Sequence, residues 1–114
     1  MPPLEDPDLL QVFKAVLSNW RFTDYVTAKD DALEWAGKNL PGFTLKSLAK
    51  LLNDHVSAGG EIDQIRETRA EWNDWPFHYD FRLSWSGRPL YIETILLDDD
   101  PSDPYLRIVR IKDA

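Results

Sequence analysis

The nine residues Phe77–Trp85, FHYDFRLSW, constrain the fold most, because apolar and polar side chains alternate through them without interruption. Successive side chains of a β-strand point to opposite faces of a sheet, so this alternation predicts a strand with one buried and one open face. A second apolar run, PLYIETILL at 89–97, follows after Ser86 and Gly87. A two-residue connection containing glycine favours a tight hairpin, since glycine tolerates a positive φ. The stretch 77–97 is therefore predicted to be an antiparallel hairpin.

The register of this hairpin predicts a polar site. Counted from the two-residue turn, Trp85 faces Arg88, and apolar side chains then gather on one face, as burial requires. The opposite face brings together the polar residues of both strands: His78, Asp80, Arg82, Tyr91 and Glu93. Asp80 and Glu93 would stand directly opposite each other, which destabilises a sheet unless cations such as Arg82 offset the repulsion.

The residues before Gly60 follow a helical period instead. Apolar side chains recur at three- and four-residue spacing and predict helices over residues 9–19, 28–36 and 45–57. The N-cap candidates are Asp6 or Asp8 for the first helix, Thr27 for the second and Thr44 for the third. The second helix is expected to end near Gly37, and the third at Gly59 and Gly60.

Two further strands complete the expected sheet. EIDQIRETR at 61–69 is the weaker candidate, because its two isoleucines do not share a parity, and YLRIVRI at 105–111 alternates more clearly. Helices followed by a run of strands predict an α+β fold, with N-terminal helices packed on one face of a C-terminal antiparallel sheet. The 114 residues fit one domain, with a helical part over about 6–58 and the sheet over about 61–112.

Composition excludes several classes of protein. The chain has no cysteine, which excludes a disulfide framework and a thiolate metal site. No apolar run approaches the roughly 18 residues of a membrane span, and no signal peptide is visible, so a soluble cytoplasmic protein without membrane contact is expected. His55 and His78 fall on different elements, and no glycine-rich phosphate loop occurs. We therefore expect neither a bound metal nor a cofactor.

The net charge of −7 weighs against nucleic-acid binding on average, because phosphate backbones are repelled by an acidic chain. The charge is uneven, however. The loop DDDPSDP at 98–104 carries −4, whereas the final stretch YLRIVRIKDA at 105–114 carries +2. A local basic site therefore remains compatible with the sequence, and the acidic loop, which lacks the glycine spacing of a calcium loop, is expected to be solvated.

The residue types of the polar face suit phosphodiester cleavage without a metal. Glu93 can take the proton of a 2′-hydroxyl group, His78 can protonate the leaving oxygen, and Arg82 can stabilise charge at phosphorus. The alternative is that the same residues form cross-strand ion pairs with a purely structural role. Trp72 and Trp75 in AEWNDWPF have two interpretations as well, since they can stack bases or anchor a partner, or can pack over the edge of the core.

The C-terminal half resembles a known family. GRPLYIETILL at 87–97, followed after a spacer by LRIVRIK at 106–112, is similar to the RelE-like mRNA interferase toxins, in particular the MqsR branch, over about residues 44–112. The resemblance implies a RelE-like fold, ribonuclease activity on mRNA and an antitoxin-like protein partner. By position, Tyr91 resembles the family's strand tyrosine, Lys112 its terminal lysine, and His78 a polar catalytic position ahead of the hairpin.

The chain departs from this family at two points. The family's upstream lysine is replaced by Gln64 or Arg66, and such toxins are usually basic, whereas this chain is acidic. Three hypotheses follow: a toxin-type endoribonuclease with a site at His78, Arg82, Tyr91, Glu93 and Lys112; a non-catalytic protein-interaction module; and an inhibitor or immunity-like protein steered to a basic partner. A basic concavity lined by His78, Arg82, Tyr91, Arg110 and Lys112 would favour the enzyme, whereas an acidic face without such a pocket would favour the second or third hypothesis.

Overall fold

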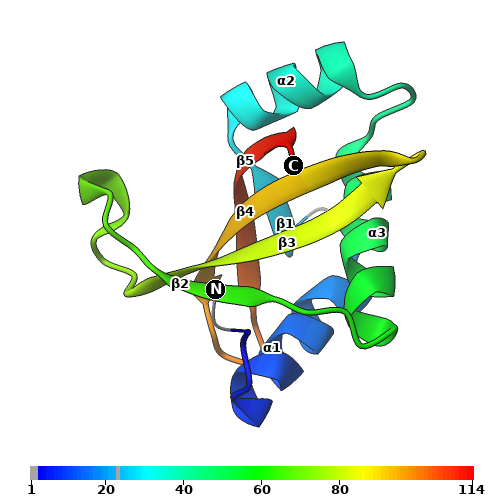
Figure 1. Cartoon of the computed structure of the whole chain (residues 1–114). Coiled ribbons are helices and arrows are strands. Elements are labelled where there is room, and N and C mark those ends of the chain that lie inside the picture. Colours follow the sequence, from blue (N-terminus) through cyan, green and yellow to red (C-terminus); the bar gives the residue numbers. More distant parts are fainter. Residues whose placement is uncertain (1–2, 23) are drawn as a thin grey trace.

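The computed structural model describes residues 3–22 and 24–114 and contains one five-stranded sheet with strand order β1-β5-β4-β3-β2 (Figure 1). The strands are β1 (Val26–Ala28), β2 (Asp63–Arg66), β3 (Phe77–Trp85), β4 (Arg88–Asp98) and β5 (Tyr105–Asp113). The helices are α1 (Pro7–Ser18), α2 (Asp30–Asn39) and α3 (Leu45–Ser57), with a single 3-10 turn η1 (Ala70–Trp72) between β2 and β3. The α+β prediction is confirmed.

The β3–β4 hairpin has the predicted register. Trp85 pairs with Arg88, and Asp80 stands opposite Glu93. Ser86 has φ 49° and Gly87 has φ 85°, and two positive values in a row define the type I′ turn that matches the twist of the flanking strands.

The sheet is mixed and not wholly antiparallel as predicted, because it contains a parallel strand, β1, that the sequence did not indicate. This three-residue strand pairs in parallel with β5, with Val26 opposite Leu106. Thr27 therefore lies in a strand and does not cap α2, whose N-cap is Lys29. The Thr27 hydroxyl instead hydrogen-bonds the hydroxyl of Tyr105 at 2.8 Å. Three residues are too few to establish a periodicity.

The remaining helix ends follow from local chemistry. The Asp6 carboxylate accepts from the backbone N–H of Asp8 at 2.9 Å and so caps α1, while Thr44 caps α3 by accepting from Ser47 N–H at 3.0 Å. α2 continues past Gly37, where the sequence predicted its end, and stops at Asn39. A glycine inside a helix is tolerated at a cost of about 1 kcal/mol relative to alanine. A glycine typically ends a helix where it takes the left-handed conformation itself, and Gly37 does not have a positive φ.

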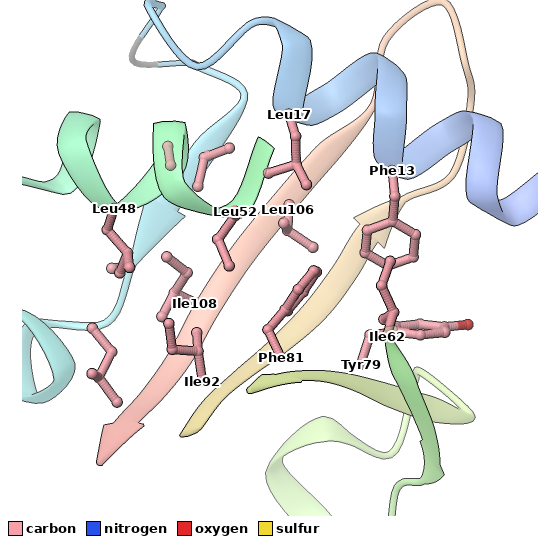
Figure 2. Close-up of a cluster of buried hydrophobic side chains, with 14 of the residues drawn as sticks. Phe13, Leu17, Leu48, Leu52, Ile62, Tyr79, Phe81, Ile92, Leu106 and Ile108 are labelled. Atoms are coloured by element: carbon pink, nitrogen blue, oxygen red, sulfur yellow. The ribbon is translucent and has the colours of Figure 1, made fainter. Parts of the chain in front are cut away.

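The hydrophobic core fills the space between the helices and one face of the sheet (Figure 2). Phe13 of α1 is fully buried and packs edge-on against Tyr79 and Phe81 of β3, with ring centroids 5.0 and 6.1 Å apart. Other fully buried members come from α1, α3, β4 and β5: Leu17, Leu48, Leu52, Ile92, Leu106 and Ile108. The opposite face, here called the helix-free face, is left for polar side chains.

The segment 67–76, which contains η1, covers part of the helix-free face. Figure 1 shows η1 on the side of the sheet away from α1 and α3. Three contacts hold the segment: Arg69 to Glu93 at 3.0 Å, Trp75 Nε1 to the Leu97 carbonyl at 3.3 Å, and Glu71 to Lys29 at 3.9 Å. Between the first two anchors on β4 lies Ile95, which is fully buried yet stands outside the main core.

Candidate functional site

The helix-free face gathers polar side chains from four neighbouring strands. Asp63 of β2 pairs with Asp80 of β3, and Asp80 pairs in turn with Glu93 of β4, which stands opposite Arg110 of β5. The next row towards the hairpin turn runs from Arg82 through Tyr91 to Lys112. These polar residues meet because the pairing of the strands places them on one face of the sheet. The hairpin turn fixes this register between β3 and β4.

His78, Asp80 and Tyr91 form one hydrogen-bonded group. His78 Nδ1 lies 2.7 Å from one Asp80 oxygen, and the Tyr91 hydroxyl donates to the other. The Asp80 side chain is completely buried, and burial raises the pKa of its carboxyl group although both hydrogen bonds oppose the shift. With Nδ1 engaged, Nε2 is the His78 nitrogen that can exchange a proton with a ligand.

His78 Nε2 faces solvent. It has no hydrogen-bond partner among residues 3–22 and 24–114, and within that part of the chain no buried side-chain nitrogen or oxygen lacks one. The same reasoning applies to Glu93, whose Oε2 accepts from Arg69 while Oε1 has no described donor. Nε2 of His78 and Oε1 of Glu93 are therefore not sealed from solvent, although their side chains are only 14% and 10% exposed.

Tyr91 is held as a hydrogen-bond donor. Burial raises the pKa of its phenol, and the bond to the Asp80 carboxylate raises it further, so the hydroxyl stays protonated at neutral pH. Lys112 Nζ lies 5.0 Å from the centroid of the Tyr91 ring, within the range of a cation–π contact. Tyr91 and Lys112, singled out separately in the sequence, are thus neighbours.

Arg69, which the sequence did not single out, neutralises Glu93. Its guanidinium donates to both oxygens of Glu67, at 2.8 and 3.0 Å, and its remaining nitrogen donates to Glu93. The bond from Arg69 lowers the pKa of Glu67, whose side chain is 1% exposed. The predicted repulsion between Asp80 and Glu93 is therefore relieved from segment 67–76 and not by Arg82. In the sequence, the two-residue spacing of Glu67 and Arg69 is the only sign that these side chains pair.

Arg82 has a different partner from the expected one. Its guanidinium donates to Asp63 of β2, with Nε 3.1 Å from Oδ2, and the pKa of Arg82 is raised by that bond. The Asp63 side chain is 5% exposed, whereas that of Arg82 is 55% exposed. Arg82 therefore balances a buried carboxylate while its outer edge borders a hollow of about 320 Å³ together with His55 and Glu61.

Cations without an ion pair line β5. Among the described residues, no carboxylate oxygen lies within 4.0 Å of Arg110 or Lys112. Arg107, one row further along the strand, donates to the Thr27 hydroxyl at 3.1 Å. These side chains give a locally basic strip on β5, with β4 between it and His78, although the chain as a whole is acidic.

The other residues considered in the sequence lie elsewhere. His55 packs edge-on against Phe81 and bonds the Glu61 carbonyl through Nε2 at 2.7 Å, so it lies at the edge of the core. Trp72 and Trp75 contact each other with centroids 5.9 Å apart. In the acidic loop, Asp100 accepts from Ser102 in a tight turn, and this bond lowers the pKa of Asp100.

Two general properties of the described residues bear on function. Within residues 3–22 and 24–114, no three histidine, aspartate or glutamate side chains are grouped in a way that could hold a metal ion. In the same ranges, no helix is both long enough and apolar enough to cross a membrane.

Comparison of the chain with protein-family models, with curated proteins and with solved structures finds no match.

Proposed function

We propose that the protein is a metal-independent endoribonuclease that cleaves single-stranded RNA on its helix-free face. The observation that carries this proposal is the His78–Asp80 pair, which orients an imidazole whose free nitrogen is not sealed from solvent, on the same face as Glu93 and the cations of β5. An oriented imidazole next to a carboxylate and a guanidinium is the set needed for general acid–base cleavage of a phosphodiester.

The roles follow from the placement of each group. Glu93 Oε1 takes the proton of the ribose 2′-hydroxyl as its oxygen attacks phosphorus, and the bond from phosphorus to the 5′ oxygen breaks. His78 Nε2 gives its proton to that leaving oxygen, so the products are a cyclic phosphate and a free 5′-hydroxyl group. His78 and Glu93 are diagonal neighbours across the hairpin, and the backbones of such neighbours are about 7–8 Å apart, so long side chains from both can reach one phosphate.

The cations stabilise the charge that develops on the phosphate. Arg110 and Lys112 stand beside Glu93 and Tyr91 on the adjacent strand, and Arg82 lies in the same row as Lys112. Preorganised donors of this kind act where charge accumulates in the transition state. The resemblance to RelE-like toxins agrees with this role for Lys112, and it alone suggests an inhibiting protein partner.

The test is cleavage of a long unstructured RNA in the presence of EDTA. His78→Ala is expected to slow cleavage by about 10²–10⁴, the usual contribution of a general acid. His55→Gln removes the other histidine, which packs against Phe81 at the edge of the core and has no part in the proposed chemistry, and should leave the rate unchanged. An all-deoxy substrate should stay intact, because it lacks the attacking hydroxyl. The proposal is wrong if the wild type leaves RNA uncut or if His78→Ala cuts as fast.

A protein-interaction module is the second candidate. It is favoured by the ion pairs that occupy two cations of this region, Arg82 with Asp63 and Arg69 with Glu67 and Glu93. Guanidinium groups already paired contribute less to phosphate binding. RNA that is neither cleaved nor retained at low salt would favour this second function.

A further inference from the structure

A second site lies at the end of the sheet, where α1 begins, β4 ends and segment 67–76 leads into β3. Here the protein has a hollow of about 340 Å³ whose wall includes Trp75, Phe77 and Tyr79, together with the aliphatic side chains of Leu9 and Leu96. A volume above roughly 300 Å³ is within the range of small-molecule sites. None of these residues belongs to the proposed ribonuclease site.

The aromatic wall is rigid. Trp75 is fixed by its bond to the Leu97 carbonyl and by its contact with Trp72. Tyr79 is fixed by Phe13, and its hydroxyl lies 3.5 Å from the Gln64 amide. Figure 2 shows this hydroxyl pointing away from the buried aliphatic side chains. A wall held in this way is formed before any ligand arrives.

Every charged side chain on the hollow is acidic. Asp99 lines it, and an adjoining hollow of about 540 Å³ shares Leu9 and Asp99 and adds Asp6 and Asp8. Burial raises the pKa of the Tyr79 phenol, the hydrogen bond with Gln64 opposes this shift, and the nearby Asp99 and Asp6 add to it. The Arg66 guanidinium lies 5.7 Å from the centroid of the Phe77 ring, so this lining ring already contacts a cation of the protein, and Trp75 and Tyr79 are the rings left to contact a bound cation.

We propose that this hollow binds a small organic cation, a quaternary or protonated ammonium group that carries an apolar body. The faces of aromatic rings attract cations, and cages of such rings recognise quaternary ammonium groups. Asp99 supplies the opposite charge at the rim, and the aliphatic side chains accommodate the apolar body. An anion would be repelled by the same carboxylates, and a neutral ligand would gain only apolar contact.

The experiment compares choline with dimethylbutanol, its uncharged carbon isostere, by isothermal titration calorimetry. Because the two probes share shape and apolar area, any difference in affinity reports the charge. The wild type is expected to bind choline at least about tenfold more tightly. Trp75→Leu and Asp99→Asn should each reduce this preference, the first by removing the ring face and the second by removing the rim charge.

Two control variants keep the test specific. Asp103→Asn removes a carboxylate from the same loop but not from the lining, and Phe22→Ala removes an exposed aromatic ring elsewhere, so both should keep the preference. Equal affinity for the two probes, or no binding of choline up to about 10 mM, overturns the proposal. So does a preference that survives in both Trp75→Leu and Asp99→Asn. The experiment does not measure RNA cleavage, so its result is independent of the proposed function.

Discussion

Asp80 shows how one buried residue organises the helix-free face. An isolated buried carboxylate is costly, and the usual compensation is a hydrogen bond to each oxygen. Asp80 has both, from His78 and Tyr91, and each bond fixes the orientation of a side chain that the proposed chemistry uses. The cost of burying Asp80 is thus offset by groups whose positions it defines.

Tyr91→Phe should change how stability depends on alkaline pH. The pKa of Tyr91 is raised in the folded protein above its ordinary value of 10.0. The contribution of Tyr91 to the free energy of unfolding is therefore complete below pH 10.0. It is lost as the pH rises above this value, because the unfolded chain then releases the phenol proton while the folded chain retains it. The loss is at most about 1.4 kcal/mol per pH unit for one group.

Urea unfolding at several alkaline pH values measures this. The free energy of unfolding of Tyr91→Phe should fall less steeply above pH 10.0 than that of the wild type. Parallel curves for the two proteins would contradict the raised pKa of Tyr91.

Arg69→Met should be strongly destabilising. It leaves Glu67 and Glu93 without their shared partner, and their side chains are only 1% and 10% exposed. Breaking a buried pair costs about 3–5 kcal/mol, and the partial exposure of Arg69 reduces the expected value to about 2–4 kcal/mol. Thermal unfolding measures the change.

Two comparisons make this result specific to the buried carboxylates. Adding Glu93→Gln to Arg69→Met should restore part of the stability, because it removes one unpaired charge. Arg66→Met removes an exposed arginine from neighbouring β2 and should have little effect. A loss no larger than that of Arg66→Met would show that Arg69 does not neutralise the two glutamates.

At the scale of the elements, two glycines should respond in opposite directions to alanine. Gly37 lies inside α2, and a Cβ atom there would meet nothing within 4 Å. Gly37→Ala should stabilise the protein by about 0.4–1 kcal/mol, because alanine has less freedom to lose in the unfolded chain and a higher helix propensity.

Gly60→Ala should be destabilising. The new Cβ would lie 2.5 Å from the imidazole of His55, which cannot easily move because it packs on Phe81 and bonds Glu61. Overpacking of this kind costs about 1–3 kcal/mol. Chemical denaturation of both alanine variants is the measurement, and equal stability of Gly60→Ala and the wild type would mean that the turn after α3 relaxes freely.

For the molecule as a whole, the division between a core face and a helix-free face can be tested with Ile95. It lies on β4 beneath segment 67–76 and is as fully buried as Phe13 in the main core. Ile95→Ala should therefore cost about 2–5 kcal/mol, comparable to Phe13→Ala at about 3–5 kcal/mol, although no helix covers it.

Urea unfolding again provides the measurement, with lower midpoints and unchanged m-values expected for both variants. A cost below about 1 kcal/mol for Ile95→Ala alone would show that segment 67–76 opens readily and contributes little to the fold.

The sequence by itself determined the features that depend on nearby residues. The alternation of β3, the two-residue turn at Ser86 and Gly87, and the caps at Asp6 and Thr44 each involve residues only a few positions apart. The register then follows from the turn, and with it the shared face of the polar residues. The candidate site was predictable to this extent.

Only the tertiary structure decided which charges meet and where β1 lies. β1 pairs with a strand about 80 positions away, Arg82 of β3 pairs with Asp63 of β2, and Arg69 reaches Glu93 from an irregular segment. None of these contacts has a periodicity or a fixed spacing along the chain. Their partners are selected by burial in the folded molecule, because a carboxylate removed from water must be paired with whichever cation the completed sheet places within reach.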